Sequence, residues 1–294
     1  MPFKTKSYAK LNIFLKIVGK EHDMHLIESL FVYIDLFDFI TITPSKANGL
    51  EITGGYKKDL LDDLKSHGDI FDKSIFARTL TAFHQNFNTS GCFKISLEKN
   101  IPIGAGLGGG SSNAATFLKF LLNFYKIEIS QKHKYELAAQ IGADCAFFMQ
   151  DSARFISGFG EKIGPKVKIK PCRINLYYDN IKANTAEVFK AYSKSNFKFS
   201  KKLSDKEISA FTNKYLKKTD LINLSTKYHN DLESAFGEVL KDQQVIRLST
   251  VDKNKFLSGS GSCYYSFVKP KNMMTNNPIC VIIIKLTQWR RYND

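Results

Sequence analysis

Residues 101–115 read Ile-Pro-Ile-Gly-Ala-Gly-Leu-Gly-Gly-Gly-Ser-Ser-Asn-Ala-Ala, and five of these fifteen positions are glycine. Before this stretch, Cys92–Glu98 alternates apolar and polar side chains, which is typical of a strand. After it, residues 111–126 carry apolar side chains at one-face helical spacing, and Ser111 is predicted to cap that helix. The glycines therefore lie between a predicted strand and a predicted helix.

This arrangement predicts a phosphate site. The first N–H groups of a helix have no partner within it, and the helix dipole adds partial positive charge there. Glycines let the backbone come close to a ligand and direct several N–H groups at one anion. The alternative is a flexible surface loop, which seldom lies so closely between a strand and a helix. The pattern is neither a Walker P-loop, because no lysine follows the glycines, nor a Rossmann fingerprint, because no βαβ unit with a placed acidic residue follows.

The length of 294 residues suits two domains, and composition shifts at residues 158–171, which hold three glycines and two prolines. We therefore expect an N-terminal domain over residues 1–165 and a C-terminal domain over residues 166–294. Helices and strands mix along the chain without strict alternation, which predicts an α+β fold.

The charge balance is strongly basic, with 43 Lys and Arg residues against 28 Asp and Glu residues and a net charge of +15. Such a balance attracts anions, whether nucleic acid, anionic lipid or phosphorylated metabolites. The lysines are spread along the chain, so a general lysine richness explains most of it. Aromatic residues interleaved with basic ones in an RNP-type motif are absent, which argues against nucleic acid as a partner.

The five cysteines are far apart and no pair has metal-ligand spacing, which predicts reduced thiols in a cytoplasmic protein. The N-terminal residues do not read as a signal peptide, and the apolar run at residues 279–284 is too short to span a bilayer. We therefore expect no membrane association.

Three segments carry candidate chemistry. Residues 9–17 alternate as a strand with one apolar face, so Lys10 and Asn12 project from the other face, as functional groups or as solvated edge residues. Residues 19–26 read as a polar turn, in which His22 and His25 are ligands, bases or plain loop residues. Asp144 follows a predicted helix over 130–140 that Ser130 caps and Gly142 ends, and it is either a desolvated base or a helix cap.

The remaining elements are predicted from periodicity and capping patterns. Strands are expected over residues 31–36, 38–43, 173–178, 263–268 and 279–286, and helices over residues 72–88 and 228–243. Two more helices are expected to begin after Asn184 and Ser204. A second glycine turn over residues 256–263 has a simple turn between strands as its alternative reading.

Taken together, residues 9–15, 23–26, 102–115, 142–144, 230–233 and 257–263 resemble, in order, motifs of the GHMP small-molecule kinases. Within that superfamily they resemble the 4-diphosphocytidyl-2-C-methylerythritol kinases of the non-mevalonate isoprenoid pathway. The resemblance implies a two-domain GHMP kinase architecture, with a ribosomal-protein-like nucleotide-binding domain, a ferredoxin-like domain and the active site between them. It also implies ATP-dependent phosphorylation of the C2 hydroxyl of 4-diphosphocytidyl-2-C-methyl-D-erythritol, with Mg²⁺ expected.

The resemblance assigns roles to individual residues. Lys10 and Asp144 match the catalytic pair: Asp144 takes the proton of the attacking hydroxyl, and Lys10 pairs with Asp144 and steadies the developing charge. The residues that match the triphosphate-binding loop are Pro102, Ile103, Gly104, Ala105, Gly106, Leu107, Gly108, Gly109, Gly110, Ser111 and Ser112. The positions that match the substrate side are Asn12, His25, Thr185 and Phe189, with Phe189 stacking on cytosine.

Several points stay open in the sequence. The protein ligands of Mg²⁺ are unassigned, with Ser111, Ser112 and Asn113 as candidates. Met24 stands where relatives usually carry tyrosine, so the aromatic sandwich around cytosine loses one side, and a methionine packs there more softly. The alternatives to the leading function are another GHMP kinase, acting on homoserine, mevalonate or a sugar, and more remotely a basic nucleic-acid-binding protein without enzymatic activity.

Overall fold

The structure is a computed structural model and describes residues 1–64, 70–178, 184–195, 198–241, 255–267 and 279–284. Its strands are β1 (Phe3–Glu21), β2 (Met24–Ser45), β3 (Gly49–Thr53), β4 (Cys92–Glu98), β5 (Arg154–Ser157), β6 (Lys162–Lys166), β7 (Lys168–Ile169), β8 (Cys172–Tyr177), β9 (Tyr215–Leu216), β10 (Lys255–Leu257), β11 (Tyr264–Ser266) and β12 (Ile279–Ile284). Its helices are α1 (Lys57–Leu64), α2 (Ile75–Phe87), α3 (Gly109–Phe124), α4 (Gln131–Ile141), α5 (Cys145–Phe148), α6 (Thr185–Lys194), α7 (Asp205–Thr212), α8 (Lys218–Tyr228) and α9 (Glu233–Lys241).

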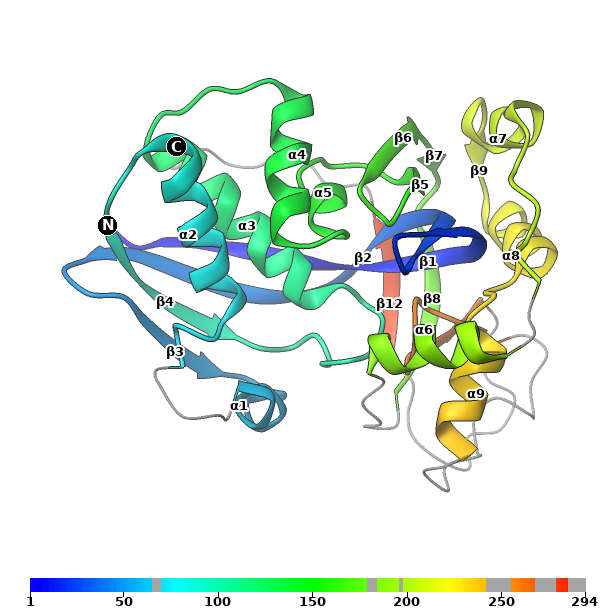
Figure 1. Cartoon of the computed structure of the whole chain (residues 1–294), viewed down its shortest axis with the longest axis horizontal. Coiled ribbons are helices and arrows are strands. Elements are labelled where there is room, and N and C mark those ends of the chain that lie inside the picture. Colours follow the sequence, from blue (N-terminus) through cyan, green and yellow to red (C-terminus); the bar gives the residue numbers. More distant parts are fainter. Residues whose placement is uncertain (65–69, 179–183, 196–197, 242–254, 268–278, 285–294) are drawn as a thin grey trace.

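The long hairpin of β1 and β2 organises the molecule and runs across most of its length (Figure 1). One continuous sheet joins the strands in the order β10-β11-β8-β12-β2-β4-β3, and β1 and β5 also pair with β2. Helices α2, α3, α4 and α5 lie beside the half that contains β4, whereas α6, α7, α8 and α9 lie beside the other half (Figure 1). The hairpin therefore carries residues from one half of the fold to the other.

The first half has an aromatic core between its sheet and its helices. The ring of Phe93 on β4 lies 5.4–5.8 Å from the rings of Phe117, Phe120 and Phe124 on α3, in edge-to-face arrangements. Burying such a side chain stabilises a fold by about 1.5–3 kcal/mol. This packing fixes α3 against the sheet and so fixes the position of its N-terminus, where the glycine stretch ends.

Strand β1 is buried on both faces over its central part. The apolar face predicted from alternation is fully buried, but Lys10 and Asn12 on the opposite face are only 3% and 1% exposed. The reading of these two residues as solvated edge positions is therefore wrong. Periodicity alone could not reveal this, because it marks the apolar face and says nothing of what covers the polar one.

Most capping signals in the sequence are confirmed. Ser130 caps α4 through a bond from the His133 N–H, Asn184 caps α6, and Ser204 forms a full capping box with Glu207 at the start of α7. Strand β4 has the predicted bounds, Cys92–Glu98.

Other boundaries differ from prediction. Residues 31–36 and 38–43 belong to one strand, β2, because that strand changes its pairing partners along its length rather than ending. Helix α3 begins at Gly109 with Gly108 as its cap, so Ser111 lies inside the first turn and does not cap it. The helix predicted over 228–243 begins only at Glu233, and its last two positions lie outside the described residues. Helix α8 was missed, since its cap residue Lys217 is not a usual capping side chain; the carboxylate of Asp220 accepts the Lys217 N–H over 2.8 Å instead.

No helix in the described part of the chain is long and apolar enough to cross a membrane. Four cysteines have described side chains, and all four are free thiols: Cys92 and Cys172 are half-buried, and Cys145 and Cys263 are buried. The fifth, Cys280, has a side chain outside the described residues.

Candidate active site

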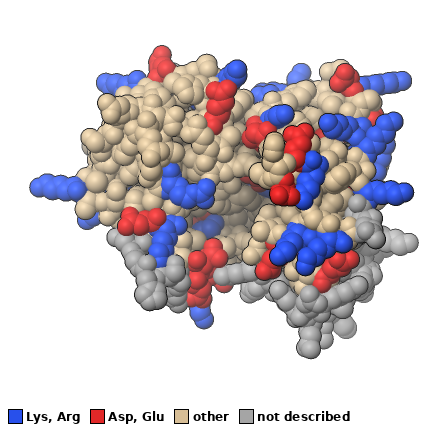
Figure 2. Space-filling view, viewed as in Figure 1, with Lys and Arg blue, Asp and Glu red and all other residues tan. Residues whose placement is uncertain are grey.

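A cavity of about 610 Å³ lies where the glycine stretch, β1 and α6 approach one another. Figure 2 shows this face of the molecule hollowed between its two halves. The predicted site residues that line the cavity are Lys10, Asn12, Pro102, Ile103, Gly104, Ala105, Gly106, Leu107, Gly108, Gly109, Gly110, Ser111, Asp144, Thr185 and Phe189. One cavity thus collects predicted site residues that are as far apart in the sequence as Lys10 and Phe189.

The glycine stretch forms a loop whose backbone needs glycine. Gly104, Gly106 and Gly108 have φ values of +66°, +71° and +68°, in the left-handed region that other residues rarely adopt. Gly108 is also the cap of α3, so the loop leads directly into the helix N-terminus.

The carbonyl oxygens of this loop are already bonded within the protein. The second glycine turn supplies most of these bonds: the N–H groups of Ser262 and Cys263 donate to the carbonyls of residues 104 and 105, each over 3.2 Å, and the Ser258 hydroxyl donates to the carbonyl of Gly106 over 3.1 Å. The Lys10 N–H donates to the carbonyl of Leu107 over 3.0 Å. Because the carbonyls are occupied and the loop precedes a helix N-terminus, the loop favours an anion.

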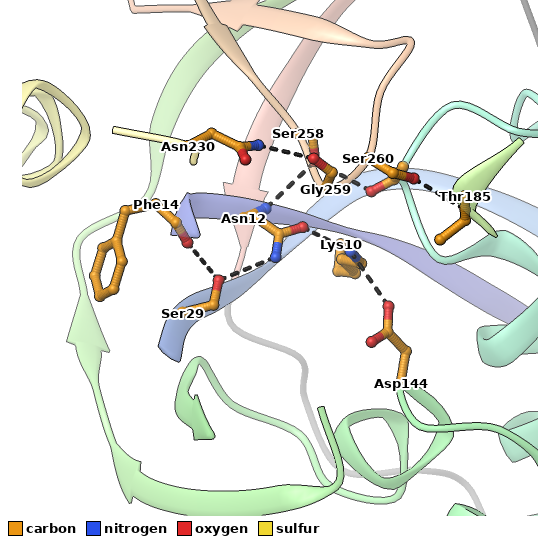
Figure 3. Close-up of polar contacts among 11 residues, drawn as sticks. Lys10, Asn12, Phe14, Ser29, Asp144, Thr185, Asn230, Ser258, Gly259 and Ser260 are labelled. Atoms are coloured by element: carbon orange, nitrogen blue, oxygen red, sulfur yellow. Dashed lines mark hydrogen bonds and ion pairs between the residues drawn. The ribbon is translucent and has the colours of Figure 1, made fainter. Parts of the chain in front are cut away.

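A lysine and a carboxylate meet beside this loop. The Nζ atom of Lys10 lies 3.3 Å from Oδ2 of Asp144, and their side chains are 4% and 31% exposed (Figure 3). Lys10 Nζ also donates to Oδ1 of Asn12 over 2.6 Å and lies 4.6 Å from the centroid of the Phe31 ring. Asp144 stands at the cap position of α5 but makes no side-chain cap bond, so the helix-cap reading of this residue is wrong. Its carboxylate remains directed at Lys10 and the cavity.

The substrate-side residues of the resemblance lie close together. The hydroxyls of Thr185 and Ser260 are 2.9 Å apart, which ties the start of α6 to the second glycine turn. The rings of Phe189 and His25 are 5.2 Å apart and tilted by 32°. His25 itself does not line the cavity: it is 9% exposed, with Nε2 3.0 Å from the Ser193 hydroxyl. Burial, followed by the charge of Lys20, lowers the pKa of His25 below its usual value, which favours the neutral ring.

Three further candidates, besides His25, do not line the cavity. Ser112 is buried and its hydroxyl accepts a hydrogen bond from the Ser7 hydroxyl over 2.8 Å, away from the lining. Met24 is 51% exposed near the end of the β1–β2 hairpin. His22 stands in the hairpin turn, and among the described residues no group of three His, Cys, Asp or Glu side chains could hold a metal ion.

The structure adds residues that sequence reasoning missed. Phe31 and Lys99 also line the cavity. Asn113, which the sequence offered as a candidate for Mg²⁺, lines it too, and within the described chain its buried Oδ1 has no hydrogen-bond partner. Lys99 pairs with the buried Asp38 over 2.5 Å, and Asp38 also accepts the N–H groups of residues 100 and 101. A charged residue inside the apolar strand β2 was the available signal for Asp38. Phe31 and Lys99 carry no local signal, since only tertiary contacts bring them to the site.

A further apolar part of the cavity lies beside β3, β4 and α2. Its aliphatic lining comprises Leu50, Leu60, Ile75 and Leu97. This wall was not anticipated, because the segment between residues 44 and 70 was read only as loops and short pieces.

Comparison with known proteins agrees with this geometry. The family model "GHMP kinases N terminal domain" matches residues 74–156, the segment that contains the glycine loop and Asp144. A solved structure described as a 4-(cytidine 5'-diphospho)-2C-methyl-D-erythritol kinase has the same fold, with a TM-score of 0.64, 24% identity and coverage of 91% of this chain and 90% of that one. Fold and site together define a small-molecule kinase of the GHMP class.

Curated relatives narrow the class further. A 4-diphosphocytidyl-2-C-methyl-D-erythritol kinase from Buchnera aphidicola subsp. Schizaphis graminum is 30% identical over 88% of this chain and 82% of its own length. A protein of the same name from Francisella philomiragia subsp. philomiragia is 29% identical over 92% of this chain and 88% of its own length. The chain belongs to the family of 4-diphosphocytidyl-2-C-methyl-D-erythritol kinases.

Proposed function

We propose that this chain transfers the γ-phosphoryl group of ATP to the C2 hydroxyl of 4-diphosphocytidyl-2-C-methyl-D-erythritol, giving the 2-phosphate and ADP. The reaction belongs to the non-mevalonate route to isoprenoid precursors. The observation that carries the proposal is the 3.3 Å pair of Lys10 and Asp144 beside a glycine loop that opens a helix, all in one cavity.

The residues divide the chemistry between them. Asp144 takes the proton of the C2 hydroxyl while that oxygen attacks the γ-phosphorus, the bond to the β-phosphate oxygen breaks and ADP leaves. Lys10 pairs with the Asp144 carboxylate and steadies the negative charge that develops on the reacting oxygen beside it. Phosphoryl transfer depends mostly on positioning and charge stabilisation, so one carboxylate, one ammonium and a loop of N–H groups suffice.

The glycine loop, residues 102–112, holds the triphosphate. Its N–H groups and the N-terminus of α3 supply the partial positive charge that phosphate oxygens need. Ser112 serves this loop indirectly, since its hydroxyl bonds to Ser7 and fixes α3 against β1.

Mg²⁺ fits this site as a companion of ATP. It prefers oxygen ligands, keeps several waters and is usually held through substrate phosphates, so a cluster of protein carboxylates is not needed. Among the candidates from the sequence, Ser111 and the unpartnered Oδ1 of Asn113 are the better-placed oxygen donors, because the Ser112 hydroxyl is engaged by Ser7. When bound, the ion neutralises charge on the phosphates.

The second substrate occupies the side of the cavity formed by Asn12, Thr185 and Phe189, with His25 behind Phe189. The neutral His25 ring supports Phe189 from behind, and Phe189 presents a ring face for stacking on cytosine. Met24 precedes His25 in the chain and is 51% exposed outside the cavity wall, so the position where relatives usually carry tyrosine adds no ring to this region.

Residues 1–165 form the nucleotide-binding domain in this proposal and residues 166–294 form the second domain, with the cavity between them. The free thiols of the four described cysteine side chains support a reducing, cytoplasmic setting for this enzyme.

The test is a coupled assay of ADP release. With ATP and Mg²⁺, we expect turnover of 4-diphosphocytidyl-2-C-methyl-D-erythritol and little or none of homoserine, mevalonate or galactose. Absence of turnover by folded protein would contradict the proposal, and a preference for one of the other alcohols would move the chain to another activity of the GHMP class.

A further inference from the structure

Ser29 on β2 lies behind the catalytic lysine, and its hydroxyl is completely buried. Ser29 does not itself line the cavity. Instead, it joins Asn12 to the backbone of β1 through two hydrogen bonds (Figure 3). A hydrogen bond from Lys10 to Asn12 continues this series. The direction of each hydrogen bond therefore affects how the lysine ammonium is held.

The hydroxyl of Ser29 has one proton, which it donates in a hydrogen bond to the backbone carbonyl of Phe14. A carbonyl oxygen can only accept, so no proton of Ser29 remains for its other partner. That other partner is the side-chain amide of Asn12, whose Nδ2 donates to the Ser29 Oγ over 3.0 Å. Ser29 is therefore obliged to act as an acceptor toward Asn12.

This obligation sets which way the Asn12 amide faces. With its NH₂ group turned to Ser29, the amide presents Oδ1 to the Lys10 ammonium, 2.6 Å away. The flipped amide would direct N–H donors at an ammonium that has only donors, which is repulsive. It would also leave Oδ1 facing the Ser29 oxygen, so both contacts fail together.

We propose that Ser29 is a positioning residue for phosphoryl transfer, which fixes the Asn12 amide so that its oxygen holds Lys10 Nζ toward Asp144. This inference rests on the proposed function, since turnover is its readout. The ammonium then has Asn12 Oδ1, Asp144 Oδ2 and the Phe31 ring face around it, and these contacts hold it in one place.

The test begins with Ser29→Ala, which removes the acceptor and frees the amide to turn. We expect kcat to fall roughly tenfold, which corresponds to about one hydrogen bond, whereas KM for ATP changes less than about twofold, because the glycine loop is untouched. The matched control is Ser152→Ala, which removes another buried hydroxyl, bonded to Gln150 Oε1 over 2.9 Å, outside the cavity. It should lower thermal stability to a similar degree and leave kcat unchanged.

The decisive measurement is the same substitution in an Asn12→Asp background. The two oxygens of a carboxylate are equivalent acceptors, so one of them faces Lys10 in either orientation and Ser29 has no orientation to set; the Ser29 hydroxyl is free to rotate and donate to the other oxygen. Here Ser29→Ala should leave kcat close to that of Asn12→Asp. A purely structural role would instead lower kcat by the same factor in both backgrounds, and that outcome would overturn the proposal.

The result separates this inference from the proposed function. If the unaltered chain does not phosphorylate the cytidyl substrate, the proposed function fails. If it does so and Ser29→Ala turns over as fast, only the positioning role fails. If Ser29→Ala does not yield folded protein, Ser29→Cys replaces it in the same comparison. Cysteine has a similar volume and a weaker acceptor, so we expect a smaller fall in kcat.

Discussion

At the scale of single residues, Asp144 allows a test of the proposed general base, because asparagine has nearly the same shape as aspartate. In Asp144→Asn the amide cannot take a proton, but it still fits beside Lys10. We expect kcat to fall by roughly 10²–10⁴-fold, the range for loss of a general base, with the affinity for ATP unchanged. A fluorescent ATP analogue measures that affinity, and Asp151→Asn, at an exposed position, is the control. Near-normal turnover of Asp144→Asn would assign the base role to another group.

His25 gives a pH-dependent prediction at the same scale. Burial and the nearby Lys20 lower its pKa, so the ring of the folded protein stays neutral as pH falls through 6.5, where an unfolded histidine becomes charged. KM for the cytidyl substrate should therefore stay flat from pH 8 to below 6.5 and rise only at lower pH. The unfolded state binds the proton more tightly, so His25 contributes stability above pH 6.5 that is lost as pH falls toward the folded pKa. A rise of KM centred at or above pH 6.5 would show that the ring is not shielded in this way.

At the scale of elements, the glycine loop and the second glycine turn touch through their backbones. A Cβ atom added at Gly106 would lie 2.0 Å from the carbonyl oxygen of Ser258 and 3.2 Å from that of Gly261, and φ is +71° there. Gly106→Val must therefore displace one of the two turns. We expect the Kd for ATP to rise at least tenfold, together with a lower melting temperature, measured by analogue titration and thermal denaturation.

Gly55→Ala is the matched control for that substitution, since an added Cβ meets nothing within 4 Å at Gly55. Its ATP affinity should equal that of the unaltered chain. If Gly106→Val bound ATP equally well, the triphosphate would have to lie away from this loop.

The elements also show what could be predicted from the sequence. Local signals sufficed where the structure is local: Ser130, Asn184 and Ser204 begin helices by capping, and β4 follows strict alternation. The single strand β2 looked like two, because its segment from Ile27 to Ile34 is buried on both faces whereas the segment beyond Asp35 is partly exposed on one. A change of periodicity inside one strand reads as a break, and only the pairing partners reveal that the strand continues.

At the scale of the whole molecule, the site is an assembly that no local pattern encodes. Lys10 and Asp144 were matched through family resemblance, and the fold places their side chains 3.3 Å apart. Ser29, Phe31 and Asp38 were missed, since each acts only through a neighbour that is distant in sequence. The long hairpin explains this result: one register of β1 against β2 places Asn12 opposite Phe31 and Lys10 opposite Tyr33, and a slip of one residue would turn both functional side chains away.

The net charge of +15 gives the last prediction. Basic side chains are spread over both halves of the face with the cavity and alternate with acidic ones, rather than forming a stripe (Figure 2). Such a field draws anionic substrates toward the cavity but offers no track for a nucleic-acid backbone. Raising the salt concentration from 20 to 200 mM shortens the screening length about threefold, so it should lower kcat/KM for ATP and the cytidyl diphosphate several-fold and leave kcat unchanged. Oligonucleotides should bind no more tightly than about 10⁻⁶ M at physiological salt, the range of non-specific association. Tight oligonucleotide binding with a steep salt dependence would instead mean that the basic surface serves a second, nucleic-acid partner.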